Sequence, residues 1–212
     1  MVISYAITTH NETEEINKLL EFLIHNTDKE DEIVILDDFS DEKTQEVFTS
    51  WQAQYGDLKT IRIEQRKLNK NFAEQKNYLT SMCSGDYIVN IDADEIPHEI
   101  FIKQIKQVLE INDVDFVWVP RVNTVKGLTE EHIKKWGWNV TEKGWVNYPD
   151  YQARIYRNEP DRIKWIKPVH ERIDGHDTYS HLPPQEELSL YHHKEIKKQE
   201  EQNKFYEGII RK

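Results

Sequence analysis

The fold is decided by residues 2–38, VISYAITTHNETEEINKLLEFLIHNTDKEDEIVILDD. Two apolar runs, Val2–Ile7 and Ile33–Leu36, have the length and the β-branched content of buried strands. Between them, apolar residues recur at helical spacing, at Ile16, Leu19, Leu20 and Leu23. The segment therefore predicts a strand, a helix and a second strand, which is how a parallel α/β sheet begins.

The same alternation continues through the first half of the chain. We expect one helix after Ser40 and another from Phe72 to Cys83, with strands at Leu58–Ile63 and Tyr87–Ile91. Four strands then alternate with three helices. The predicted fold class is therefore α/β, with a mainly parallel central sheet that is covered by helices on both faces.

The second half of the chain has a different character. Val114–Val122 predicts one more buried strand, whereas Asn123–Asp150 is a long irregular stretch that looks like an inserted binding region. Short strands are expected at Tyr151–Arg157, Val169–Ile173 and Leu188–His192. We expect a single domain over residues 1–193 and a charged helical extension over residues 194–212, which offers a surface for a possible homodimer.

Composition excludes several classes of function. The 212 residues carry a net charge of −11, and residues 1–50 hold 13 acidic against 3 basic side chains, which is unlike a nucleic-acid-binding protein. No run of 18 apolar residues is present, and the N-terminal segment lacks the pattern of a secretory signal. Cys83 is the single cysteine, so no internal disulfide can form. These features predict a cytoplasmic protein.

Polar side chains follow each of the four strands at its carboxyl end. They form the segments Thr8–Glu12, Asp37–Asp38, Glu64–Lys67 and Asp92–Glu95. Because ligands of open α/β sheets bind outside the carboxyl ends of the strands, we expect these segments to line one site. Asp92 and Asp94 suit Mg²⁺ or Mn²⁺ bridging a diphosphate, although Asp-x-Asp is also typical of a solvated strand end.

Four motifs occur in a characteristic order. They are residues 3–12 (ISYAITTHNE), 33–41 (IVILDDFSD), 71–77 (NFAEQKN) and 90–95 (NIDADE). This set resembles glycosyltransferase family 2, the inverting group with the GT-A fold. The resemblance implies a nucleotide-sugar half in residues 1–120 and an acceptor half in residues 121–193. Later segments, 151–157, 169–171 and 191–194, look like the branch that includes small bacterial lipopolysaccharide-core glucosyltransferases.

The resemblance implies which residues bind the donor. The nucleotide sugar would be bound by Thr8, Thr9, Asn11, Glu12, Asp38, Lys70, Lys76, Asp92 and Ala93. Asp38 would accept the N3–H of uracil, which favours a UDP sugar. The basic residue that contacts the phosphates stays open between Arg66, Lys70 and Lys76.

The same resemblance implies a metal site and a general base. Asp92 and Asp94 would hold Mn²⁺ or Mg²⁺, with His192 as the third ligand and His170 or His193 as competitors for that role. Glu171 would be the general base that deprotonates the acceptor hydroxyl. A structural role for Glu171, as an ion-pair partner of Arg154 or Arg172, is the alternative.

Aromatic residues in the irregular stretch suggest where the acceptor binds. Trp136, Trp138 and Trp145, with Arg154, are the expected acceptor-binding residues, although buried tryptophans are also ordinary core. The implied function is metal-dependent, inverting transfer of a hexose from a UDP sugar to a hydroxyl of a glycan or surface-polysaccharide precursor. The alternatives are a nucleotide-sugar-binding module without turnover and a nucleotidyltransferase. The latter would need a basic, glycine-rich loop where residues 8–12 stand.

Overall fold

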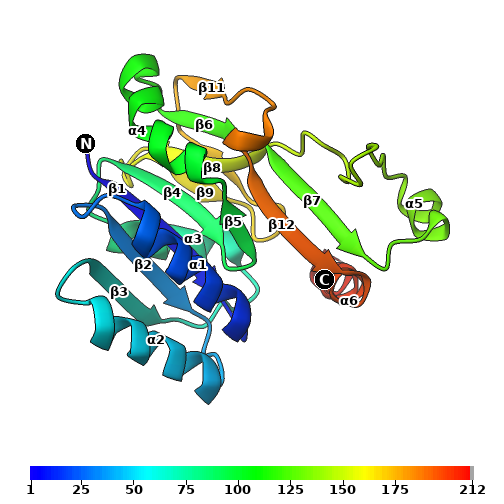
Figure 1. The fold of residues 1–212 in the computed structure, drawn as a ribbon, viewed down its shortest axis with the longest axis horizontal. Coiled ribbons are helices and arrows are strands. Elements are labelled where there is room, and N and C mark those ends of the chain that lie inside the picture. The colour runs from blue at the N-terminus through cyan, green and yellow to red at the C-terminus, as the bar shows by residue number, and fades with distance from the viewer. Residues whose placement is uncertain (211–212) are drawn as a thin grey trace.

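The structure is a computed structural model that describes residues 1–210, with side chains described for residues 1–204. Its main sheet has the strand order β11-β6-β8-β4-β1-β2-β3 (Figure 1). The bounds of the first four strands are β1 Ile3–Thr9, β2 Glu32–Asp37, β3 Thr60–Gln65 and β4 Tyr87–Asp92. These four strands run parallel, which confirms the predicted α/β sheet.

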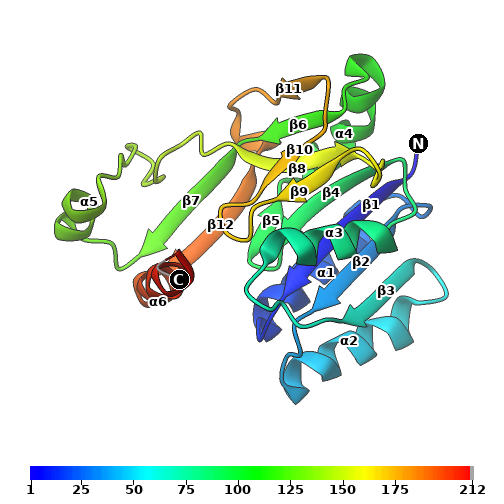
Figure 2. The same ribbon diagram turned by 180° about the vertical axis from the view of Figure 1, so that it is seen from behind.

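Helices cover both faces of the main sheet. Helices α1 (Thr13–Asn26), α2 (Glu42–Tyr55) and α4 (Glu99–Asn112) lie on one face, and α3 (Phe72–Met82) lies on the other (Figures 1 and 2). Side chains alternate along each strand, so β1 turns Tyr5 toward the first group of helices and Ala6 toward α3. Helix α4 is absent from the helices expected above, although its apolar residues recur at helical spacing.

The single strand expected at Val114–Val122 is wrong, because the chain changes sheets at Pro120. Strand β6 (Phe116–Val119) belongs to the main sheet, and β7 (Arg121–Lys126) belongs to a second sheet of order β5-β12-β7. Proline has no N–H to donate to a strand ladder, so it marks the place where pairing is interrupted.

The rest of the second sheet forms an arm beside the main sheet. Strand β5 (Glu95–Pro97) starts directly after β4, and β12 (Leu190–Glu195) lies between β5 and β7. Figure 1 shows β7 and β12 extending away from the main sheet, with α5 (Glu130–Trp136) near the far end. The irregular stretch expected at Asn123–Asp150 therefore contains the end of a strand and a helix.

The remaining elements are short. They are β8 (Gln152–Arg157), β9 (Lys164–Ile166), β10 (Arg172–Asp174), β11 (Tyr179–His181), the 3-10 helix Glu186–Leu188 and α6 (Ile196–Ile210). The strand expected at Val169–Ile173 begins three residues later, at Arg172. Within the described part of the chain, no helix has the length and apolar content needed to span a bilayer.

Asp115 holds several of these short elements together. Its carboxylate accepts hydrogen bonds from Arg162 at 2.8 and 2.9 Å and from the backbone N–H of Asp177 at 2.8 Å. Asp115 itself is only 8% exposed. The hydrogen bonds from Arg162 hold the pKa of Asp115 well below its usual range, so the group is ionised and paired in the folded protein.

Asp115→Asn should lower the free energy of unfolding at pH 7 by about 2 kcal/mol, because Arg162 loses its charged acceptor. A carboxyl whose pKa is lowered by folding stabilises the folded protein at pH values above its unfolded pKa of about 4. That stabilisation decreases as the pH falls below this value. Urea denaturation at pH 7 and pH 3 measures both effects, with the exposed Asp161→Asn as the control. A variant-to-wild-type difference that does not shrink at pH 3 would contradict the assignment.

Candidate active site

A pocket of about 900 Å³ opens at the carboxyl ends of β1, β2 and β4. Of the residues predicted for the site, those that line it are Thr8, Thr9, Glu12, Asp38, Lys76, Asp92, Asp94, Trp138, Arg154, Glu171 and His192. Strand ends from the main sheet, the arm and α6 all contribute lining residues. The sheet therefore gathers at one place most of the residues that the sequence pattern selected.

The tips of β1 and β2 form one wall of the pocket. Asp38 follows β2 and accepts a hydrogen bond from the backbone N–H of Leu68 at 3.0 Å. Glu12 lies at the start of α1, where burial, with Asp94 nearby, raises its pKa to about 7. Asn11 is not a lining residue; its side chain accepts from the backbone N–H of Asp41 at 2.8 Å and so joins the two tips.

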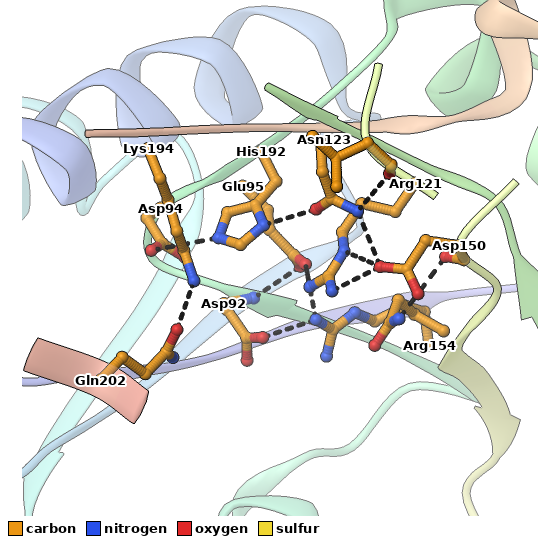
Figure 3. Close-up of polar contacts among 12 residues, drawn as sticks. Asp92, Asp94, Glu95, Arg121, Asn123, Asp150, Arg154, His192, Lys194 and Gln202 are labelled. Carbon is orange, nitrogen blue, oxygen red and sulfur yellow. Dashed lines mark hydrogen bonds and ion pairs between the residues drawn. The ribbon is translucent and has the colours of Figure 1, made fainter. Parts of the chain in front are cut away.

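The Asp92–Glu95 turn forms what we call the floor of the pocket, because its residues Asp92 and Asp94 line it. Figure 3 shows the polar contacts of this turn. Asp92 accepts a hydrogen bond of 2.5 Å from Arg154, which is 3% exposed, and Arg154 also donates to Glu95 at 2.6 Å. Burial alone would raise the pKa of Asp92, but Arg154 and Lys76 outweigh it and lower that pKa. Ala93 is buried and is not a lining residue.

A second arginine connects this floor to the arm. Arg121 of β7 donates to Glu95 at 2.8 Å and to Asp150 at 2.7 and 3.0 Å. Asp150 also accepts from Asn123 at 2.8 Å (Figure 3). Acidic and basic side chains therefore alternate from Asp92 through Arg154, Glu95 and Arg121 to Asp150.

Asp94 and His192 meet on the other side of the turn. Their Oδ2 and Nε2 atoms are 3.4 Å apart, and His192 is 6% exposed. Burial lowers the pKa of His192 below that of a free imidazole, although Asp94 opposes this effect. Lys198 of α6 places its ammonium 3.4 Å from the same Asp94 oxygen, 3.2 Å from Glu12 and 3.3 Å from Glu15.

The donor set beside Asp94 fits a divalent cation held by two protein ligands. A carboxylate and an imidazole are both suitable ligands, and a side-chain cation, Lys198, already lies against the carboxylate. Among residues 1–204, no three His, Cys, Asp or Glu side chains are gathered to hold a metal ion. The predicted set of three ligands is therefore not assembled, because Asp92 is bonded to Arg154 instead.

Lys76 and Glu171 pair across the pocket from this cluster. Lys76 of α3 donates to Glu171 at 2.6 Å, lies 3.9 Å from Asp92, and places its ammonium 4.4 Å from the centre of the Trp165 ring. Lys76 therefore forms its ion pair with Glu171. The ion-pair partner of Glu171 is thus Lys76 rather than Arg154 or Arg172. Lys76 is 4% exposed and connects the carboxylates on the two sides of the pocket.

The three predicted tryptophans are placed differently. Trp138 lines the pocket and packs on Trp136, with ring centres 4.6 Å apart. Trp145 packs on Tyr148 at 4.8 Å, and the ammonium of Lys143 lies over its ring. None of the three is among the buried core residues, and all three are partly exposed.

The remaining candidates lie at or beyond the pocket edge. Lys70 lines a smaller neighbouring hollow together with Asp38. Arg66 donates to Gln75 at 2.6 Å, so of the three candidate phosphate contacts only Lys76 lines the pocket. Of the histidines, His170 lines the pocket, whereas His193 is on the opposite side of its strand from His192 and stacks on Tyr191.

The sequence did not predict several of the residues that line the pocket. They are Arg121, Asn123, Asp150, Trp165, Lys194 and Lys198. Strand periodicity gives a usable signal for one of them: Leu190 is fully buried, so His192 and Lys194 share its side of β12 and His193 faces away. The partners of Glu95 give no such signal, because they come from strands separated by many residues.

Comparisons with known proteins agree with this geometry. The family model described as glycosyl transferase family 2 matches residues 4–176. Glycosyltransferase GlyG of Streptococcus pneumoniae is 27% identical over 117 residues, which are 55% of this chain and 38% of GlyG. The putative glycosyltransferase EpsE of Bacillus subtilis is 28% identical over 94 residues, or 44% of this chain and 33% of EpsE.

Solved structures show the same fold. A fragment of S. aureus TarS in complex with UDP-GlcNAc superposes with a TM-score of 0.63 at 17% identity, covering 91% of this chain and 58% of the fragment. The chain thus spans less than two thirds of the relatives it matches. The GT-A architecture is confirmed, and the family match covers well over half of the sequence. The chain belongs to glycosyltransferase family 2.

Proposed function

We propose that this chain is a glycosyltransferase that transfers a hexose from a UDP sugar to an acceptor hydroxyl with inversion at the anomeric carbon. One observation carries the proposal. Asp38, Asp92, Asp94 and the Lys76–Glu171 pair line a single pocket at the carboxyl ends of the strands. That pocket has about 900 Å³, which suits a nucleotide sugar with part of an acceptor.

The nucleotide would lie against the tips of β1 and β2. Asp38 bonds to Leu68 N–H through Oδ1, and its Oδ2, which lies 4.0 Å from Nδ1 of His10, would accept the N3–H of uracil. Thr8 and Thr9 line the same wall. In this arrangement Asp92, held by Arg154, faces the ribose or the sugar, and Lys76 is the basic residue nearest the phosphates.

Asp94 and His192 would hold the divalent cation, Mn²⁺ or Mg²⁺. Ions of this kind commonly take one or two protein ligands and complete their shell with substrate phosphates and water, so two ligands are sufficient. When bound, such an ion acts as a Lewis acid that stabilises the negative charge developing on the departing diphosphate. Lys198 must withdraw from Asp94 or move toward the phosphates to make room for it.

Glu171 is the proposed general base. It would take the proton of the acceptor hydroxyl as that oxygen attacks the anomeric carbon from the face opposite the diphosphate. Its carboxylate accepts a hydrogen bond from Lys76 at 2.6 Å, and this contact orients the carboxylate in the pocket. Lys76 leaves one carboxylate oxygen of Glu171 available for the proton, because the hydrogen bond uses only Oε1.

The acceptor would approach along the arm. Trp138 lines the pocket, and its ring packs against that of Trp136, with the ring centres 4.6 Å apart. Aromatic faces stack on the apolar side of sugar rings. The proposed acceptor is therefore a saccharide, such as a glycan or surface-polysaccharide precursor, bound in the half formed by residues 121–193.

Donor binding and transfer can be tested separately. Calorimetric titration with UDP, UDP-glucose and UDP-GlcNAc, with and without Mn²⁺, measures donor binding without an acceptor. UDP release in the presence of saccharide acceptors or water then measures turnover. Binding without any UDP release favours a binding module, and absence of nucleotide binding refutes the whole proposal.

Asp94→Asn should abolish most of the Mn²⁺-dependent part of UDP affinity and leave the metal-independent part, because the amide lacks the negative charge with which the carboxylate attracts the cation. Titration with UDP at fixed Mn²⁺ measures the change. Glu15→Gln is the matched control, since it removes another carboxylate that contacts Lys198. Undiminished Mn²⁺ stimulation in the Asp94 variant would remove Asp94 from the ligand set.

Glu171→Gln should retain donor affinity and reduce kcat by about 10²- to 10⁴-fold, because glutamine keeps the hydrogen bond from Lys76 but cannot accept a proton. UDP release under saturating donor measures the loss. Asp174→Asn, an exposed carboxylate on the neighbouring strand, is the control. A wild-type rate in the Glu171 variant would exclude this residue as the base.

A further inference from the structure

We propose that Asn123 and Asp150 are positioning residues that hold His192 in its Nδ1–H tautomer. The Nε2 lone pair then faces Asp94, where a cation can accept it. This inference rests on the proposed function only where it names a divalent cation as the ion that Nε2 would bind. The tautomer itself is a property of the protein alone.

The strand register brings the three groups together. His192 of β12 lies directly opposite Asn123 of the neighbouring β7, and on its other side it pairs with Glu95 of β5. The Nδ1 atom of His192 is 2.8 Å from Oδ1 of Asn123. Asn123 is itself 2.8 Å from Asp150, measured between its Nδ2 atom and Asp150 Oδ2 (Figure 3).

Asp150 determines which way the Asn123 amide points. Oδ2 of Asp150, the atom that faces Asn123, accepts two hydrogen bonds from the Arg121 guanidinium, so this oxygen acts as an acceptor. The Asn123 group that faces it must therefore be the NH₂ donor. This leaves the carbonyl oxygen of Asn123 directed at His192, and the opposite amide orientation would set two acceptors against each other.

The amide in turn determines the tautomer of His192. A carbonyl oxygen cannot donate, so the hydrogen of the 2.8 Å contact must belong to Nδ1 of His192. In the neutral imidazole, Nε2 then carries a lone pair, and it lies 3.4 Å from Asp94 Oδ2. The Nε2 lone pair and the Asp94 oxygen repel each other at this distance unless a cation lies near them. In the structure the ammonium of Lys198 lies 3.4 Å from that oxygen.

In the opposite tautomer, the Nε2 atom of His192 would carry a hydrogen and could not bind a metal ion. With the hydrogen on Nε2, His192 would donate to Asp94, and neither atom would be free for a metal ion. Outer groups that fix the tautomer of a ligating histidine commonly contribute about 10- to 100-fold in metal affinity. In this arrangement Asn123 and Asp150 act on the cation site through His192.

The tautomer can be observed directly in the metal-free protein. Long-range ¹H–¹⁵N correlation spectra of histidine-labelled protein at pH 8 with EDTA distinguish a protonated from an unprotonated ring nitrogen, and His192→Gln identifies the signals. The expected result is a hydrogen on Nδ1 and none on Nε2. A hydrogen on Nε2 overturns the proposal.

Two variants test the roles of the positioning residues. Asn123→Leu removes the acceptor, so the His192 hydrogen should move to Nε2, and Mn²⁺ affinity measured by electron paramagnetic resonance should fall about 10- to 100-fold. The double variant Asn123→Asp with Asp150→Asn exchanges amide and carboxylate while keeping the charge, and it should restore both the Nδ1–H tautomer and Mn²⁺ affinity. Thr124→Val is the control, because that hydroxyl contacts His193 instead of His192.

The outcomes separate this inference from the proposed transferase. An unchanged tautomer, or unchanged Mn²⁺ affinity, in Asn123→Leu overturns the positioning role. If that variant does not fold, the wild-type spectrum and the double variant still decide the question. The predicted tautomer and its loss, found in a protein that transfers no sugar, would support the inference while refuting the transferase.

Discussion

The buried carboxylate of Glu95 is the interaction on which the pocket depends. Glu95 is fully buried, and it receives Arg154 from the main sheet, Arg121 from the arm and the backbone N–H of Asp92. An unpaired charge at this depth would cost several kcal/mol, whereas two guanidinium groups and a backbone donor satisfy it. Glu95 therefore joins the two sheets at the floor of the pocket and fixes the Asp92–Glu95 turn between them.

This arrangement makes the two sides of the pocket one connected structure. Starting at Asp94, contacts pass through His192, Asn123, Asp150, Arg121, Glu95 and Arg154 and return to Asp92. The two aspartates of one short turn are thus oriented by groups from β7, β8 and β12. A shift of the arm therefore changes the direction of both carboxylates, so the arm and the strand ends of the main sheet are coupled.

The sequence was sufficient for the parts of the site that strand ends provide. Apolar runs and helical spacing predict β1 to β4, and the polar segments at their ends contain Asp38, Asp92 and Asp94. The residues that orient those side chains could not be predicted in the same way. Asn123 and Asp150 acquire their roles from the pairing of β7 with β12 and from the turn at Pro120, both of which depend on long-range packing. The three ligands expected from the sequence are not gathered among residues 1–204, where Arg154 comes from a distant strand to bind Asp92.

Helix α6 is attached to the pocket through ion pairs that are more exposed to solvent than those in the rest of the wall. Its Lys198 is 41% exposed at the side chain, and its partners Glu12, Glu15 and Asp94 are carboxylates. Separating the first turn of α6 from α1 therefore exposes charged groups to water and leaves the apolar core of the sheet intact. Such local openings cost far less than global unfolding. Because dissolved salt screens exposed charges, access to the pocket should respond to ionic strength while the stability of the sheet does not.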